Sequence, residues 1–246
     1  MKQIKSDLTA WCAVIFFSLL YPWINPFAPG PSPVVIPLWF TWLCVATIIF
    51  SFATGTQISI KRLNVLVAES WLIAGLISGC MAVLQYFGAA ADFSPWVNQT
   101  RYGEAFANLR QRNQFATLTN ISLSALLWLL WTSTQPNVEF AKRAKKTIAL
   151  GCVAAGLLMI GNAASSSRTG LFQLMLLCIL CGVWGQWRQP VVRWALGYAV
   201  LAYCIAAFAL PYLAGLDLSM HGVAARLGQD DACGSRLMLW SNVLHL

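Results

Sequence analysis

The sequence predicts an all-α, polytopic integral membrane protein with about seven transmembrane helices. Charged residues make up only 10% of its 246 residues, apolar residues make up 59%, and the mean hydropathy is +0.65. An ordinary soluble domain carries roughly 25% charged residues. This composition excludes a soluble globular domain, a disordered chain and a coiled coil.

The number of helices follows from long stretches that contain no charged side chain. A helix that crosses a membrane needs about 20 mostly apolar residues. Residues 8–60 have room for two such helices, and later stretches have room for about one each. We therefore expect a transmembrane domain over residues 1–214, with spans near 8–24, 36–56, 63–86, 114–134, 147–163, 170–187 and 194–214.

The first span resembles a signal peptide, because Lys2 and Lys5 precede an apolar stretch. No small-residue cleavage site follows, and the stretch continues into a proline-rich connection over residues 22–37. We interpret it as a retained first helix, with the second span after that connection.

The third span contains Glu69, an acid inside an apolar stretch. Acids in membranes are costly and often functional, but pairing with Lys61 or Arg62 is an equal interpretation. The next connection, residues 87–113, is the longest between spans and mixes aromatic with polar side chains. That composition is typical of an interfacial or re-entrant segment.

Seven of the eight cysteines fall within the expected spans. Cys178 and Cys181 form a C-x-x-C spacing inside the sixth span, with no other type of metal ligand beside them, so we interpret them as packing residues. Residues 215–246 turn polar and predict the start of a loop on the outer side. The chain is expected to be an N-terminal portion or a truncated gene product.

The lysines indicate the orientation of the chain. All six lie near the N-terminus or in the connections after the second and fourth spans, and Arg188 and Arg193 follow the sixth. This is the positive-inside pattern, which predicts a cytoplasmic N-terminus and a C-terminus on the opposite side. The net charge of +8 therefore reflects topology, and we expect no nucleic-acid partner.

The opposite, outer side carries arginine but no lysine. Its basic residues are Arg101, Arg110, Arg112, Arg168, Arg226 and Arg236. Arginine presents a planar fork that grips phosphate through two hydrogen bonds. The alternative is that these side chains only extend to the membrane interface.

Two outward helix starts strengthen the phosphate interpretation. Arg110 and Arg112 precede the fourth span, and residues 165–168 open the sixth with three serines and Arg168. Helix N-termini carry partial positive charge and free N–H groups, so two such ends side by side would bind a diphosphate. The serines could also act only as helix caps.

Amide side chains accompany these arginines at Gln111, Asn113 and Gln114. Amides both donate and accept hydrogen bonds, which suits sugar hydroxyls or the hydroxyl of an acceptor. The alternative for Asn113 is an N-terminal helix cap. No cluster of metal ligands and no cofactor motif accompanies this set.

Three segments resemble the bacterial O-oligosaccharyltransferases that glycosylate pilins and other secreted proteins, a family related to the O-antigen ligases and polymerases. They are residues 108–117 (Asn-Leu-Arg-Gln-Arg-Asn-Gln-Phe-Ala-Thr), 166–170 (Ser-Ser-Arg-Thr-Gly) and 235–240 (Ser-Arg-Leu-Met-Leu-Trp). The resemblance covers most of the chain from about residue 60 onward.

The resemblance implies a glycosyltransferase of the bacterial inner membrane that acts on the periplasmic face. Its partners would be an undecaprenyl diphosphate-linked glycan, membrane lipid and a pilin-like or other secreted protein, whose serine or threonine hydroxyl receives the glycan without a metal or other cofactor. Arg168 and Arg236 match the arginines that hold the diphosphate, and Gln111, Asn113 and Gln114 match the family's amide motif.

The chain also departs from that family. Its members are much longer, and their catalytic histidine lies beside an asparagine in a periplasmic loop, beyond the position that corresponds to Leu246. His245 and His221 are candidates, the catalytic base stays unassigned, and we expect the isolated 246-residue chain to be inactive. The alternatives are an O-antigen ligase acting on lipid A core, or a transporter or flippase for an anionic lipid, although we find no internal repeat of the kind that transporters often show.

Overall fold

The computed structural model describes residues 2–25, 35–53, 58–133, 140–217 and 222. In this part of the chain every regular element is helical and no strand is present, as the composition predicts. The elements are α1 (Lys2–Ile24), α2 (Val35–Ala53), α3 (Ile60–Tyr86), η1 (Ala89–Phe93), α4 (Arg112–Ser133), α5 (Phe140–Ala164), α6 (Arg168–Val183), η2 (Gln186–Arg188) and α7 (Pro190–Leu213).

Four of the α-helices are long and apolar enough to cross a membrane. They are α3, α4, α7 and the Lys146–Ala164 part of α5. The apolar parts of α1, α2 and α6 are shorter, at 10–17 residues. The α6 helix ends at Val183, before the expected 187, because Gly185 adopts a left-handed conformation (φ 69°) and Pro190 then begins α7.

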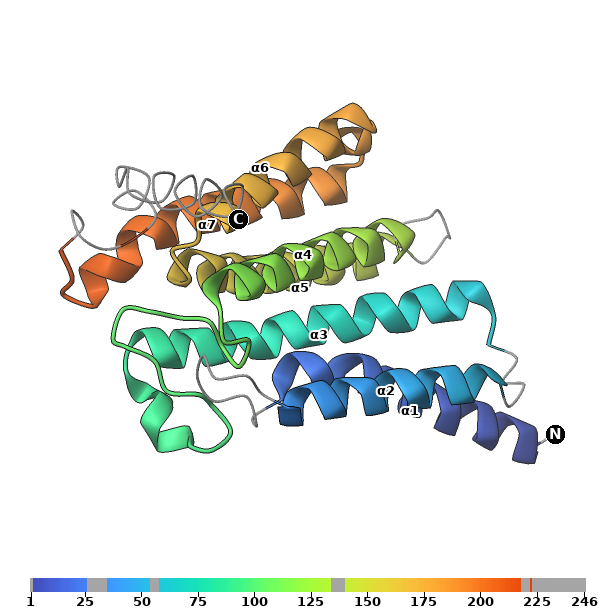
Figure 1. The fold of residues 1–246 in the computed structure, drawn as a ribbon. Coiled ribbons are helices and arrows are strands. Elements are labelled where there is room, and N and C mark those ends of the chain that lie inside the picture. The colour runs from blue at the N-terminus through green and yellow to red at the C-terminus, as the bar shows by residue number, and fades with distance from the viewer. Residues whose placement is uncertain (1, 26–34, 54–57, 134–139, 218–221, 223–246) are drawn as a thin grey trace, which may run out of the picture.

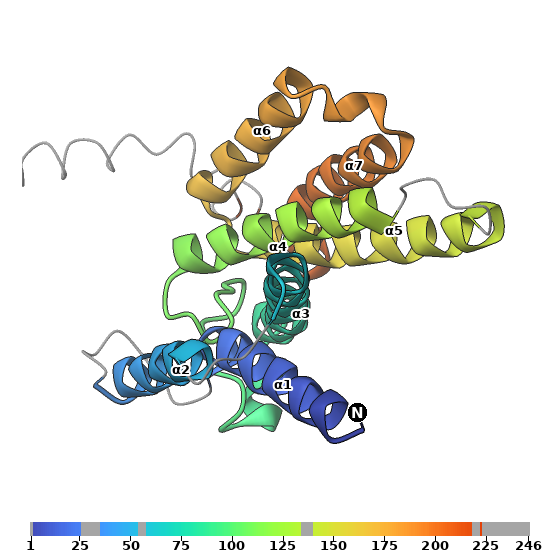
Figure 2. The ribbon, with the colours of Figure 1, turned by 90° about the vertical axis from the view of Figure 1, so that its right-hand side faces the viewer.

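Helix α3 lies at the centre of the bundle. Viewed along its axis, α1 and α2 lie on one side of it and α4 and α5 on the other (Figure 2). Helix α7 packs mainly on α5, whereas α6 packs on α4 and touches η2 at its far end. As a result, α6 is held in the described bundle chiefly by α4.

Small residues let the central helices approach closely. Gly75 and Gly79 lie one turn apart on α3, a spacing common where membrane helices pack. A Cβ added at Gly161 of α5 would lie 3.2 Å from the Cα atom of Gly79, so the two backbones cross at these glycines. Glycine is favoured at 161 by this close approach and not by its backbone conformation.

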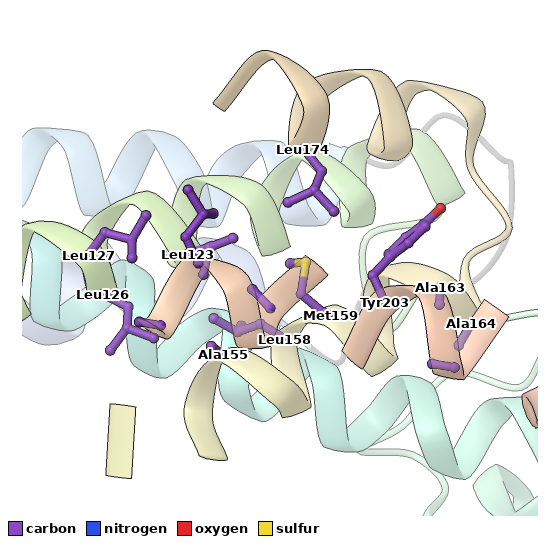
Figure 3. Packing of buried hydrophobic residues seen from close by; sticks show 14 of the residues in the cluster. Leu123, Leu126, Leu127, Ala155, Leu158, Met159, Ala163, Ala164, Leu174 and Tyr203 are labelled. Atoms are coloured by element: carbon purple, nitrogen blue, oxygen red, sulfur yellow. The ribbon is translucent and has the colours of Figure 1, made fainter. Parts of the chain in front are cut away.

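The interior is filled by aliphatic side chains from α4, α5, α6 and α7. Leu123, Leu158 and Met159 are fully buried, and Leu174 of α6 and Tyr203 of α7 belong to the same cluster (Figure 3). Large apolar residues also cover the outside. On α7 these are Trp194, Tyr198, Leu201, Ile205, Phe208, Tyr212 and Leu213. An apolar exterior around a tightly packed interior is what a lipid environment requires.

The two ends of the bundle carry different sets of basic residues. Helix α3 starts, α6 ends and α7 starts at one end, next to Lys61, Arg62, Arg188 and Arg193. The connection over residues 87–111 and the starts of α4 and α6 lie at the opposite end (Figure 1). The order of the helices therefore places Lys61 at one end of the bundle and the arginine-bearing starts of α4 and α6 at the opposite end, as the sequence predicts.

Glu69 takes neither of its expected partners. It follows Lys61 and Arg62 by about two helical turns, and the described residues show no ion pair between it and either cation. The pairing alternative is therefore wrong.

Candidate functional site

The connection after α3 folds around one buried amide, Gln85. The Nε2 group of Gln85 donates to the carbonyl oxygens of Asn98 and Ala107, at 2.8 and 2.7 Å. Its Oε1 atom accepts from the backbone N–H groups of Phe106 and Ala107, at 3.0 and 2.7 Å. Because Gln85 has no exposed surface, these four bonds satisfy an amide that would otherwise destabilise the helix end.

A second amide, Asn108, closes the same connection. Its Oδ1 atom accepts from the backbone N–H of Asn98 at 3.0 Å, and its Nδ2 group donates to the carbonyl oxygens of Trp96 and Ile24 at 2.9 and 3.3 Å. The expected interfacial segment is therefore a folded platform on the end of α3. Phe93, Trp96 and Tyr102 remain exposed on it.

The platform leads directly into α4, and its last residues approach the start of α6. Ser167 caps α6, since its hydroxyl accepts from the backbone N–H of Gly170 at 3.2 Å. The same hydroxyl donates to Oδ1 of Asn113, in the first turn of α4, at 2.8 Å. The first turns of α4 and α6 thus lie side by side, joined by a hydrogen bond between residues that are 54 positions apart.

This contact corrects one expectation for Asn113. The residue does not cap α4, because it lies inside the helix, and the first helical N–H···O bond runs from Phe115 to the carbonyl of Gln111. The capping prediction for the serines holds at Ser167.

Polar contacts between α4 and α6 continue for another turn. Asn120 donates to the carbonyl oxygen of Gly170 at 3.1 Å and to Oε1 of Gln173 at 3.3 Å. Gln173 in turn donates to the hydroxyl of Thr117 at 3.0 Å. In an apolar medium such bonds hold helices together, so they fix the N-terminal half of α6 on α4.

Asn162 of α5 lies beneath these two first turns. Its side chain is fully buried, and within the described part of the chain neither Oδ1 nor Nδ2 has a hydrogen-bond partner. A Cβ added at Gly170 would lie 2.3 Å from Oδ1 of Asn162 and 2.8 Å from Cβ of Ala116. Glycine at 170 is therefore what lets α6 pack this closely on α4 and α5.

Two of the backbone strains in the chain precede these helix starts. Arg110, two residues before α4, has φ 67°, and Ser166, two residues before α6, has φ 50°. Residues other than glycine rarely adopt such angles, and where they do the surrounding structure imposes them.

The described arginines of the candidate site are partly accessible. Arg168 is the first residue of α6 and is half-buried. Arg112 is the first residue of α4, and its guanidinium lies 3.6 Å from the carboxylate of Glu104. Both members of that ion pair are about one-third exposed, so the pair contributes little and an anionic ligand could displace it. Gln111 and Gln114 are exposed beside them.

Several expected site residues lie outside the described residues. These are Arg226, Arg236, His221 and His245. The structure therefore brings together Arg110, Arg112, Asn113 and Arg168 through the first turns of α4 and α6, and Arg236 remains an expectation.

A groove of about 410 Å³ lies elsewhere, between α3 and α4. It is lined mainly by apolar residues, including Trp71 and Trp128, and on α4 it begins at Ile121. Ile121 follows Arg112 by nine positions, or about 13 Å along the helix. The groove and the arginine set are therefore separate features.

Sequence reasoning missed the structural amides Gln85, Asn120 and Asn162. The signal for each was present, since all three are strongly polar residues within apolar helical stretches. Such residues are rare in spans and face other helices when they occur.

Over the described residues the fold is all-helical, with four helices long and apolar enough to cross a membrane, as in helical membrane proteins. A family model described as protein glycosylation ligase matches residues 105–130, which contain the end of the platform and most of α4. No curated protein and no solved structure matches the chain. Over the matched segment the chain is thus similar to a glycosylation ligase, and that segment includes Arg110, Arg112 and Asn113.

Proposed function

We propose that the protein is a membrane glycosyltransferase that moves a glycan from an undecaprenyl diphosphate carrier to a serine or threonine hydroxyl of a secreted protein. The observation that carries this proposal is the junction of the first turns of α4 and α6. It places two helix N-termini beside Arg112 and Arg168, within a segment similar to protein glycosylation ligases.

The proposed donor site combines the positive charge of arginine guanidinium groups with the partial positive charge of two helix N-termini. Arg168 holds the diphosphate through its planar guanidinium, and Arg110 and Arg112 contribute from the start of α4. The free N–H groups and dipoles of two helix ends add to them. Gln111 and Gln114, exposed on the same turn, contact the glycan or the acceptor hydroxyl. Arg236 joins this set through the family resemblance.

The reaction follows from what these groups stabilise. The acceptor oxygen attacks the anomeric carbon of the glycan, the bond from that carbon to the diphosphate oxygen breaks, and the diphosphate leaves with the bonding electrons. Fixed cations lower the barrier because they stabilise the charge that develops on the leaving group. The proton of the acceptor hydroxyl passes to a base that the described residues do not assign.

The proposed setting is the bacterial inner membrane. In that setting all seven α-helices cross the bilayer, with the N-terminus in the cytoplasm and the α4 and α6 starts on the periplasmic side. Among the described residues, lysine lies only at the end of the bundle opposite the α4 and α6 starts, and this distribution supports the orientation.

The test is glycan transfer in membranes that contain the protein in its natural full length. Membranes are supplied with an undecaprenyl diphosphate-linked glycan and a pilin-like acceptor, and the acceptor is weighed by mass spectrometry. The expected result is an acceptor heavier by one glycan, with the increase lost in Arg168→Ala at equal expression. Transfer to lipid A core sugars instead would favour an O-antigen ligase, and movement of labelled donor across vesicles without transfer would favour a flippase. Either result would contradict the proposal.

A further inference from the structure

The hydroxyl of Ser167 makes two hydrogen bonds at once. As an acceptor it caps α6 through the backbone N–H of Gly170, at 3.2 Å. As a donor it binds Oδ1 of Asn113 at 2.8 Å. A hydroxyl has one hydrogen and two lone pairs, so the two bonds are compatible and each polarises the oxygen in favour of the other.

The position of Ser167 makes this bond important for its neighbour. Ser167 is buried, with 1% of its surface exposed, and the next residue is Arg168. Helix α6 is held mainly by α4. A contact that fixes the first turn of α6 therefore also fixes the backbone position from which the Arg168 side chain extends. The Asn113 side chain links the first turn of α4 to the cap of α6 through this hydrogen bond.

We propose that Asn113 is a positioning residue, which holds the first turn of α6 against the first turn of α4 and thereby sets the place of Arg168 relative to Arg112. This inference rests on the proposed diphosphate site and gives Asn113 a different role from its neighbours. All three amide residues are exposed, but the side-chain oxygen of Asn113 accepts a hydrogen bond from Ser167, whereas we assign Gln111 and Gln114 to the glycan or acceptor.

The first experiment uses the full chain without any donor. Hydrogen exchange is measured at the backbone amides of Gly170 and Leu171, whose partners are the hydroxyl and the carbonyl of Ser167. Asn113→Leu removes the acceptor, and exchange is expected to become about fivefold faster. Asn113→Asp keeps an acceptor oxygen for the Ser167 hydroxyl, and exchange is expected to stay near the native rate.

These two variants separate positioning from direct contact with sugar. Both lose the amide N–H donor, but only Asn113→Leu loses the acceptor that binds Ser167. Native exchange in Asn113→Leu, or equally fast exchange in both variants, would overturn the inference.

The second experiment measures the Kd of purified full-length chain for undecaprenyl diphosphate. Asn113→Leu is expected to weaken binding about fivefold, and Ser167→Ala at least as far because it also removes the cap on Gly170. The double variant is expected to bind no more weakly than Ser167→Ala, because the bond between Asn113 and Ser167 is already lost in each single variant. Thr169→Val, which removes an exposed hydroxyl from the same turn, is the matched control and is expected to bind normally. Additive losses in the double variant would overturn the positioning role.

The proposed function can fail separately. If Arg168→Ala leaves the Kd for undecaprenyl diphosphate unchanged, the diphosphate site is wrong. The hydrogen-exchange comparison involves no donor, so it judges the contact between Asn113 and α6 in either case.

Discussion

Replacing Gly170 with alanine should damage the candidate site without touching a charged group. The added Cβ would lie 2.3 Å from Oδ1 of Asn162 and 2.8 Å from Cβ of Ala116, whereas ordinary contact begins at 3.4 Å. The Asn162 amide can turn aside, but a Cβ atom cannot. Helix α6 must therefore move away from α4 by about 0.6 Å, the difference between 3.4 and 2.8 Å.

The displacement should affect activity more than stability. Overpacking a helix contact costs about 1–3 kcal/mol, and the better helix propensity of alanine offsets about 1 kcal/mol of it. Arg168 lies two residues before Gly170, so it moves with the helix. Misplacing a catalytic group by about 1 Å can reduce rates by about 100-fold, and we expect Gly170→Ala to lose about tenfold in glycan transfer.

The assay compares Gly170→Ala with Gly197→Ala. Gly197 lies in α7 with open space around its Cα atom, so its alanine variant should transfer at the native rate and unfold at an equal or higher temperature in detergent. Both variants are compared with the native chain at matched membrane levels. Native transfer by Gly170→Ala would refute the close packing of α6 on α4 as a requirement of the site.

Two further predictions concern the platform and the orientation. Gln85→Leu leaves the backbone groups that bind this amide without partners, so limited proteolysis should cut residues 97–108 faster. The control Asn64→Leu changes an exposed amide of the same helix and should not increase cutting. Equal cutting of the two variants would contradict the role of Gln85. In a cysteine-free background, an impermeant thiol reagent added to intact cells should label Gln99→Cys and not Gln189→Cys, and the reverse pattern would invert the proposed orientation.

The course of the helices could be predicted from the sequence because it depends on local composition. Charge-free stretches of sufficient length fix where helices form, and the alternation of lysine-bearing connections separates the two ends. The cap at Ser167 was predictable for the same reason, since a serine before a helix start acts within its own turn.

The contacts that build the candidate site could not be predicted in this way. The bond between Asn113 and Ser167 joins residues 54 positions apart, and the bonds of Gln85 reach residues 13–22 positions later. Such partners depend on how the helices pack, which in turn depends on close approaches at Gly79, Gly161 and Gly170. Local sequence suggested a glycan or acceptor contact for Asn113, with a helix cap as the alternative, whereas tertiary packing gives it a partner on another helix.

The central claim, that the guanidinium of Arg168 grips the diphosphate of the donor, is tested most directly by Arg168→Lys. Lysine keeps the charge but loses the planar fork and its paired hydrogen bonds. In membranes with matched expression, glycan transfer from the lipid-linked donor should fall about 10–100-fold for Arg168→Lys, nearly as far as for Arg168→Ala. Transfer by the lysine variant close to the native rate would contradict this account, because charge alone would then suffice at the start of α6.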